Sequence, residues 1–461
     1  MPITLTNAVL LNLDPIEVLQ GAIRIESDVI SAVGSDVIPA VNDETLDCNG
    51  AVVMPGLVNG HTHLYSALAA GMPMPRHTPK NFHEILRFIW WRLDRALDAK
   101  SIEMSGRIGA IDALRCGTTT LIDHHASPNA IEGSLSRLEK GIADVGLRAV
   151  LCYETTDRNG PAGSEAGLHE NRRYLDVCRQ RKNDRFAALV GAHAAFTLGD
   201  ESLRACVQLA ADYRSGIHIH VAEDPCDDAI CRETYGAPLI PRLEACGLLA
   251  ANRDGSTKQV GAVGAASIFG HGTHLAPEDA RWISAQIAAL AHNPRSNMNN
   301  RVGYAPVSHM ERVQLGTDGI GGDMFAEAKH AWFKACDAHS PSSKAEGPSR
   351  EILPNGIVGM LAHAARVAGD TLGCRLGTFS PGAAADVVVT DYVPATPLTG
   401  ENASAHLLFA LGSRSVRHAL VGGQWLLKDR RPVLVDEASI RTEAVPVAHD
   451  LWARMQAIPE E

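Results

Sequence analysis

The sequence predicts an α/β protein, a (β/α)8 (TIM) barrel with a small β-sandwich domain built from the N- and C-terminal segments. Three observations support this fold class. With 461 residues, 45% of them hydrophobic, the chain can bury a large core and exceeds one typical domain. Between residues 56 and 379, short apolar runs alternate with helix-like stretches, as in parallel strands joined by helical crossovers. Both ends of the chain contain short β-type runs broken by turn formers.

Eight apolar runs can be counted in the central part of the chain, which matches the number of strands in a (β/α)8 barrel. A doubly wound sheet usually has fewer strands and needs a glycine-rich loop after the first, whereas here the first run ends in histidines. The runs cover residues 58–63, 119–124, 149–153, 187–193, 216–223, 266–271, 286–292 and 313–318.

The two ends of the chain are predicted to form one composite β domain, made of residues 1–55 and 380–435. A turn at Ser380-Pro381-Gly382 precedes a return to β structure at residues 385–389. In this division residues 56–379 form the barrel, and residues 436–461 form a C-terminal helix.

Composition and charge exclude several classes of protein. The chain has 42 Lys and Arg against 53 Asp and Glu, a net charge of −11, and its one basic run, at residues 179–185, is typical of a solvated helix end. Nucleic acid is therefore not an expected partner. Ten cysteines are scattered without a C-x-x-C motif, and no apolar window is long enough for a membrane span. We expect a soluble cytoplasmic protein without a membrane partner.

The polar ends of the predicted strands are the most informative feature. Six of the eight runs end in or beside histidine and a seventh ends in aspartate, and at the C-terminal face of a barrel such residues converge on one site. His61 and His63 lie two residues apart on a strand, so both side chains point the same way and can hold one metal ion. The alternative is a pair of hydrogen-bonded histidines near a turn.

A second pair of histidines on one face of a strand, His218 and His220, ends the fifth run. His220 lies nearer the C-terminal end of the strand, so we predict it as a metal ligand and His218 as a deeper, hydrogen-bonded partner. Glu223 follows three residues later. It can carry a proton beside the metal, or it can be an acid favoured at the N-terminus of a helix.

Asp318 ends the eighth run between two glycines, where an aspartate is often only a turn former. Because the first and eighth strands of a barrel are neighbours, it should lie beside His61 and His63. Three imidazoles and one carboxylate suit a divalent cation with a free position for water, whose proton Asp318 can accept. His271, at the end of the sixth run, can hold hydroxide or stabilise a developing oxyanion.

The fourth run bears on the number of metal ions. Barrels that hold two bridged metals commonly use a modified lysine at the end of the fourth strand, and residues 186–196 contain no lysine. We therefore expect one metal ion.

Further histidines are candidates for substrate binding. His193 and His292 end the fourth and seventh runs and can either contact substrate or form ordinary strand-end hydrogen bonds. With His124 and His125 from the second run, they would give a pocket flat walls that suit a planar amino-heterocycle.

An aromatic run at residues 88–91 is a further candidate for the pocket wall. It mainly indicates helix packing, since consecutive helical residues cannot all face one site, although one tryptophan, Trp90 or Trp91, can cap the pocket. Arg92 can pair with a substrate carbonyl or with an acid at the surface.

These residues resemble the amidohydrolase superfamily, in the aminohydrolase branch of deaminases and triazine hydrolases. The motifs are residues 54–63 (MPGLVNGHTH), His220-x-x-Glu223, His271, residues 292–297 and residues 316–319. Segments outside these motifs, including residues 90–95, 123–130 and 152–154, resemble the SsnA-type aminohydrolases along nearly the whole chain. Arg295 departs from that group, in which an acid is expected, and this change would alter the preference for substrate charge.

The resemblance implies a role for each residue of the site. His61, His63, His220 and Asp318 would bind the metal, Glu223 would shuttle a proton, His271 would contact water and the oxyanion, and His193 would contact substrate. It also implies zinc as the metal, with iron as the alternative, and a homo-oligomeric assembly.

The predicted function is hydrolytic deamination of an amino-substituted nitrogen heterocycle, of purine or pterin type, with release of ammonia. A metal lowers the pKa of water to about 7, hydroxide adds to the ring carbon, and Glu223 protonates the adjoining ring nitrogen. The alternatives are a cyclic amide hydrolase, a triazine-type chloro- or alkylaminohydrolase, and a non-catalytic barrel scaffold. A scaffold should have lost ligands, yet none of the predicted set is missing.

Overall fold

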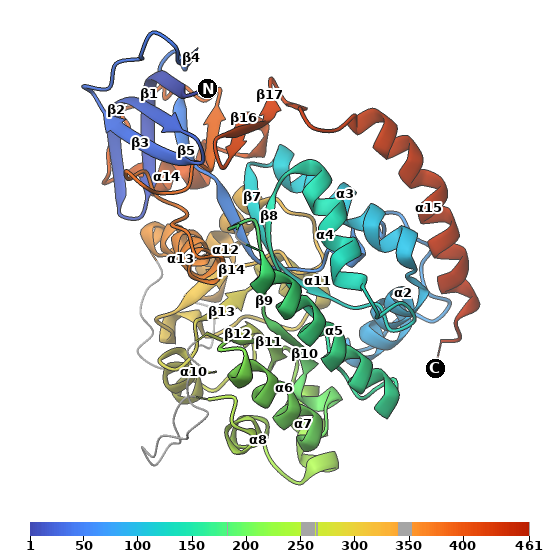
Figure 1. Cartoon of the computed structure of the whole chain (residues 1–461). Helices are drawn as coiled ribbons and strands as arrows, with labels where there is room; N and C mark the ends of the chain where they lie inside the picture. Colours follow the sequence, from blue (N-terminus) through green and yellow to red (C-terminus); the bar gives the residue numbers. More distant parts are fainter. Residues whose placement is uncertain (182, 250–262, 264–265, 340–352, 461) are drawn as a thin grey trace.

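The computed structural model of the chain describes residues 1–181, 183–249, 263, 266–339 and 353–460. Its main body is a ring of parallel strands surrounded by helices (Figure 1), which confirms the predicted (β/α)8 barrel. The ring consists of β6 (Leu57–Thr62), β7 (Thr118–His125), β8 (Arg148–Tyr153), β9 (Phe186–Ala188), β10 (Val190–Ala194), β11 (Ile217–Val221), β12 (Ile268–His271), β13 (Ala289–His292) and β14 (Val313–Leu315).

Two seams close the ring. Strands β6 to β9 pair in order, as do β10 to β14, and every pair is parallel. A bridge between Thr155 and Ala192 joins the two groups on one side, and a bridge between Thr62 and Asp318 joins them on the other. The fourth apolar run was predicted as one strand, but Leu189 divides it into β9 and β10.

The outer helices follow the strands along the chain. They are α3 (Ala99–Arg115), α4 (Ser134–Val145), α5 (Pro161–Gln180), α6 (Asp200–Asp212), α7 (Pro225–Tyr235), α8 (Leu239–Cys246), α10 (Pro277–Ser284), α11 (Pro294–Asn300), α12 (Met324–Ala338) and α13 (Pro354–Leu372). Asp98 and Ser101 form a capping box at the start of α3, which satisfies backbone N–H groups that the helix leaves free. Apolar side chains of α13 pack against the beginnings of several strands and cover that end of the barrel.

Strands from both ends of the chain form one nine-stranded sheet beside the barrel, with β5 pairing antiparallel to β15. Apolar side chains from both sets of strands share one core, including Leu10, Ile23, Val387 and Leu420. The strands are β1 (Ile3–Leu13), β2 (Ile16–Glu26), β3 (Val29–Gly34), β4 (Glu44–Asp47), β5 (Val52–Pro55), β15 (Val387–Thr390), β16 (Val416–Val421), β17 (Gln424–Lys428) and β18 (Arg431–Pro432). The domain boundaries at residues 55, 379 and 435 stay predictions.

The remaining helices cover the barrel and its edges. The long C-terminal helix α15 (Glu437–Ala457) runs along the barrel next to α2 and α3 (Figure 1), and away from the composite sheet. The others are η1 (Leu64–Ser66), α1 (Phe82–Ile85), the π-helix η2 (Leu86–Trp90), α2 (Trp91–Ala96), η3 (Ala195–Thr197), η4 (Val307–His309), α14 (Ala403–Phe409) and η5 (Ser413–Ser415).

A buried ion pair links the barrel to the composite sheet. The guanidinium of Arg148, at the start of β8, donates from Nε to Asp386 Oδ2 at 2.9 Å and from a terminal nitrogen to Oδ1 at 3.1 Å. The two side chains are 0% and 3% exposed. Arg148 also contacts the more exposed carboxylate of Asp184 at 2.7 Å, so Asp386 is its buried counter-charge.

We expect Asp386→Asn to lower the free energy of unfolding by about 3 kcal/mol, because it leaves the Arg148 guanidinium without its main counter-charge. Urea denaturation of the variant and the parent protein measures this difference. Asp337→Asn is the control, since the Asp337 side chain is 73% exposed, and it should leave the midpoint unchanged. Equal midpoints for Asp386→Asn and the parent would contradict the prediction.

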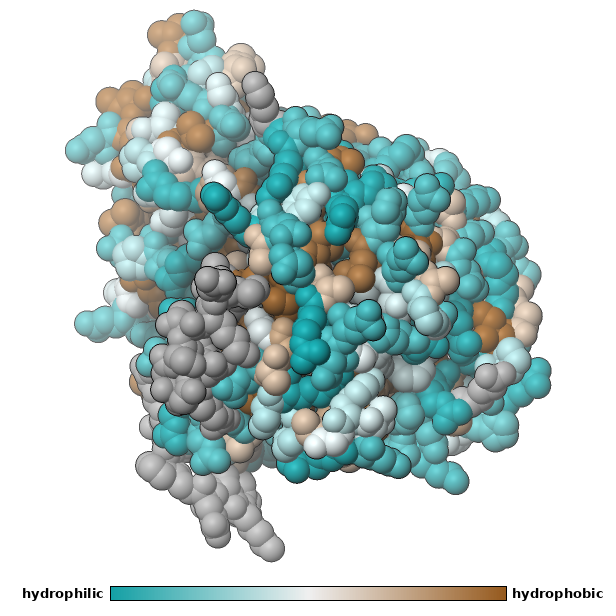
Figure 2. Space-filling model, turned by 60° about the horizontal axis from the view of Figure 1, so that its bottom comes forward, coloured by the Kyte–Doolittle hydropathy of each residue, from teal (hydrophilic) through white to brown (hydrophobic). Residues whose placement is uncertain are grey.

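The surface agrees with the composition of the chain. Hydrophilic side chains cover most of the face shown in Figure 2, with apolar ones between them. Among the described residues, no helix is long and apolar enough to cross a membrane. All ten cysteines are free thiols.

Candidate active site

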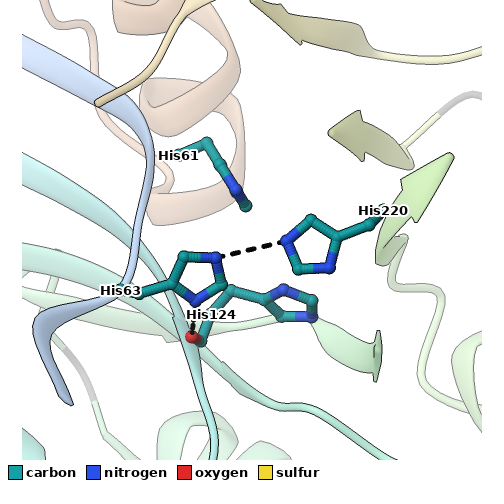
Figure 3. Close-up of side chains that lie close together, drawn as sticks. All are labelled: His61, His63, His124 and His220. Atoms are coloured by element: carbon teal, nitrogen blue, oxygen red, sulfur yellow. Dashed lines mark hydrogen bonds between the residues drawn. The ribbon is translucent and has the colours of Figure 1, made fainter. Parts of the chain in front are cut away.

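The predicted metal ligands meet at the C-terminal ends of the barrel strands. His61, His220, His271 and Asp318 each offer a ligand atom, and these atoms lie within 4.8 Å of one another. His63 joins them, because its Nε2 lies 2.9 Å from Asp318 Oδ1 and 3.2 Å from His220 Nε2. Figure 3 shows the rings of His61, His63 and His220 directed toward a common space. The structure thus brings together the whole predicted ligand set.

Each of the three ligand histidines is held at Nδ1, so that Nε2 faces the common space. The contacts are His61 Nδ1 to His218 Nε2 at 2.8 Å, His63 Nδ1 to the carbonyl oxygen of His124 at 2.6 Å, and His220 Nδ1 to the carbonyl oxygen of His193 at 2.8 Å. Metal-binding histidines usually have such a partner on the second nitrogen, which fixes the ring and its tautomer.

The site fits a divalent metal by the chemistry of its donors. Burial lowers the pKa of His61 to about 4 and holds the pKa of His220 well below its usual range, so both rings are neutral, as metal binding requires. His61 Nε2 is buried and has no hydrogen-bond partner. Three imidazoles and one carboxylate are typical ligands of a catalytic zinc ion.

Asp318 is held in place by the turn after β14. Its backbone φ is +52°, in the left-handed region that aspartate tolerates. Ser296 donates from Oγ to Asp318 Oδ2, which leaves Oδ1 toward His61 and His63. A Cβ on Gly316 would lie 2.6 Å from the Cβ of His61, so glycine there allows the two chain segments to approach.

Glu223 and His271 lie side by side next to the ligands. His271 donates from Nδ1 to Asn297 Oδ1 at 2.8 Å, and its Nε2 lies 3.5 Å from Glu223 Oε2. Burial raises the pKa of Glu223 well above its usual range, and the carboxylates of Asp318 and Asp227 add to this effect. The raised pKa favours the protonated form of Glu223, which can donate a proton.

A pocket opens in front of these residues, and both His193 and Trp90 line it, as do Trp91, Tyr65 and Asn300. His193 donates from Nδ1 to Thr197 Oγ1 at 2.8 Å, since the threonine hydroxyl donates to the carbonyl oxygen of Ala194. This leaves His193 Nε2 as an acceptor. Both tryptophans reach the pocket because the segment that carries them includes a π-helix.

The free volume of this pocket is about 50 Å³, and the segment at residues 82–96 forms part of its wall. A larger hollow of about 630 Å³ lies at the other end of the strands, where Phe186, Gly216 and Ala288 line it. It is remote from the candidate metal ligands.

Three predicted substrate contacts do not reach the pocket. Arg92 is bound by the C-terminal segment, because its guanidinium donates to the carbonyl oxygens of Met455 and Ile458 at 3.0 Å and to Glu460 at 2.9 Å. Arg92 therefore does not line the pocket, and its role as a substrate contact stays a prediction. Arg295, the departure from the resembled group, also points away and pairs with Glu327.

His125 and His292 are also directed away from the pocket. His125 follows the inward-facing His124 on the same strand, so its side chain points to the other side and contacts Ser127 Oγ at 3.0 Å. His292 is buried with its ring 5.6 Å from that of Tyr304. Neither lines the pocket.

The sequence reasoning gave no role to Glu154, at the end of the third strand. Its carboxylate is 3% exposed and lies 3.2 Å from His63 Nδ1, 3.4 Å from His124 Nδ1 and 3.9 Å from His193 Nε2. The sequence contained a signal for this residue, because Glu154 is a polar residue that directly follows the third apolar run. His124 was placed only in the pocket wall, yet it offers a ligand atom to a second group with His61, His63 and His220 (Figure 3).

Comparisons with known proteins find relatives along nearly the whole chain. A 5'-deoxyadenosine deaminase of Methanosarcina mazei is 27% identical over 466 residues, covering 99% of each chain. A 5-methylthioadenosine/S-adenosylhomocysteine deaminase of Desulforudis audaxviator is 28% identical and covers 89% of each chain. The solved structure of an adenosine deaminase from Xanthomonas campestris with bound zinc superposes with a TM-score of 0.79, at 21% identity and 99% coverage of both chains.

The family assignment rests on a family model. It describes the amidohydrolase family and matches residues 52–426, which is most of the chain and includes every candidate ligand. The chain belongs to the amidohydrolase family.

Proposed function

We propose that this protein is a metal-dependent hydrolase that removes an amino group from a nitrogen heterocycle of purine or pterin type. The observation that carries the proposal is the buried carboxyl group of Glu223, 3.5 Å from His271 Nε2, next to three histidines and one aspartate that can bind a metal. The names of the two deaminase relatives support the same reaction.

We propose one zinc ion, bound by His61, His63, His220 and Asp318, with iron as the alternative. The zinc in the related adenosine deaminase structure supports this choice. The donors support it as well, because imidazole nitrogens and a carboxylate oxygen suit zinc and iron. When bound, such an ion lowers the pKa of water and so makes a nucleophile available at neutral pH.

The side chains of this protein then move the protons. Glu223 donates its proton to the ring nitrogen next to the carbon that carries the amino group, which makes that carbon a better electrophile. His271 Nε2 is an acceptor, since Nδ1 donates to Asn297, and it would accept a hydrogen bond from the hydroxyl group that adds at the same position. Asp318 Oδ1 accepts a proton from water, and one proton returns to the amino nitrogen before ammonia leaves.

His193 Nε2 is proposed to accept a hydrogen bond from the substrate, with Trp90 and Trp91 against the ring. A cytoplasmic location and a homo-oligomeric assembly are also proposed. The free cysteines support the first, and the resemblance to aminohydrolases supports the second.

The test is ammonia release by zinc-loaded protein across aminopurines, their nucleosides, aminopterins, cytosine and amino-triazines. Hydantoins and dihydropyrimidines serve as controls and are assayed for ring opening. We expect ammonia from at least one aminopurine or aminopterin compound. Ring opening of the controls without ammonia release would replace the proposal by cyclic amide hydrolysis.

A further inference from the structure

The substrate pocket carries an excess of acidic side chains. Its described lining includes no Lys or Arg but includes five acids, namely Asp94, Glu154, Glu223, Asp227 and Asp318. Asp318 belongs to the candidate metal site, and Glu223 lies beside His271. Of the other three acids, Asp94 is paired with Arg158, whereas the contacts of the described residues give Glu154 and Asp227 no Lys or Arg partner.

The arginines of the described chain that lie close to the pocket are bound by other groups. The Arg158 guanidinium pairs with Asp94 and stacks over Trp91, 5.0 Å from the ring centroid. Arg92 is held by the C-terminal segment, and Arg295 pairs with the buried Glu327. A negatively charged substituent on a substrate would therefore meet no free guanidinium among these three residues.

The rest of the wall contains the neutral polar residues Tyr65, Ser66, His193 and Asn300 and an apolar part. Phe82, Leu86, Trp90, Trp91 and Phe196 form the part away from the metal ligands. An anion placed against these side chains loses its hydration without gaining a partner, which is costly. Close to a carboxylate such as that of Glu154 it is also repelled.

We infer that the substrate is an uncharged amino-heterocycle that bears no phosphate or carboxylate group, with its N–H groups directed toward Glu154 and Asp94. This inference rests on the proposed deamination and narrows its substrate class. The inferred preference for an uncharged substrate would distinguish this protein from relatives named for S-adenosylhomocysteine, because that compound carries a carboxylate.

The first experiment compares matched compounds on the zinc-loaded protein. The pairs are 5'-methylthioadenosine with S-adenosylhomocysteine, adenosine with its 5'-monophosphate, and pterin with pterin-6-carboxylate. We expect kcat/KM for the uncharged member to be higher by at least about 100-fold in every pair that is turned over, since juxtaposed like charges cost several kcal/mol. Equal kcat/KM within a pair would overturn the inference and leave the proposed deamination intact. Absence of ammonia from all six compounds and from the wider panel would contradict the proposed function, and the inference would fall with it.

Two variants with opposite expected effects test whether the charge of the pocket causes the preference for the uncharged compound. Asp94→Asn removes a negative charge and frees Arg158, so it should reduce the preference for the uncharged member by about tenfold. Arg158→Gln leaves Asp94 unpaired and should increase that preference. Asp144→Asn, which breaks the surface pair with Arg107, is the control and should leave the ratio unchanged. If Asp94→Asn and Arg158→Gln changed the ratio of kcat/KM in the same direction, the explanation by pocket charge would be contradicted. If neither variant folds, the comparison of matched compounds on the parent protein decides whether the inference holds.

Discussion

Glu223→Gln is expected to lower kcat by about 10²- to 10⁴-fold, the usual contribution of a general acid–base group. The amide keeps the shape of the side chain but cannot deliver the proton that the buried carboxyl group of Glu223 holds. Metal content should stay at the parent level, because Glu223 is not among the predicted ligands. Steady-state ammonia release and metal analysis of the same preparation measure both quantities.

The matched control for Glu223→Gln is Glu233→Gln, an exposed residue on α7, the helix that begins just after Glu223. It should have the turnover of the parent protein. If Glu223→Gln retained full turnover as well, Glu223 would be only an acid at a helix terminus.

His220→Ala is expected to remove most of the bound metal and nearly all activity. The substitution deletes one of three imidazoles whose Nε2 atoms face the common space. It leaves two imidazoles and the Asp318 carboxylate, which weakens the binding of the ion. Metal analysis of protein purified without chelator should fall from about one equivalent to a small fraction of that value. The exposed His169→Ala on α5 is the control and should keep the metal.

Two results would count against this ligand set. Retention of a full metal equivalent by His220→Ala would show that His220 is not a ligand. About two equivalents in the parent protein would contradict the assignment of a single ion, and His124, which lies within reach of His61, His63 and His220, would be the first additional ligand to test.

Much of the fold could be predicted because the barrel has a strong local signal. Each buried strand is a short apolar run, and its polar ending marks the C-terminal face of the ring. The pairing of His61 with Asp318 followed from ring closure alone, since the first and eighth strands must be neighbours. The choice of His220 over His218 followed from their order along the strand, and the structure places His218 behind His61. The closer likeness to SsnA-type proteins stays a prediction.

Other placements depend on contacts between distant segments, which periodicity does not reveal, or on an irregular local backbone. Arg92 pairs with Glu460, a residue 368 positions further along the chain, and nothing near Arg92 in the sequence indicates this partner. Residues 90 and 91 both line the pocket because a π-helix interrupts the regular helical spacing. His125 lies outside the pocket wall because two consecutive strand residues cannot face the same side.

The measurement that tests the central claim most directly is the source of the oxygen in the product, followed in isotope-labelled water with the most active compound of the panel. Hydrolytic deamination by zinc-loaded protein predicts one solvent oxygen in the product for each ammonia released, loss of both after chelation, and recovery of both when zinc is restored. A product without solvent oxygen, or turnover that persists in metal-free protein, would contradict the account.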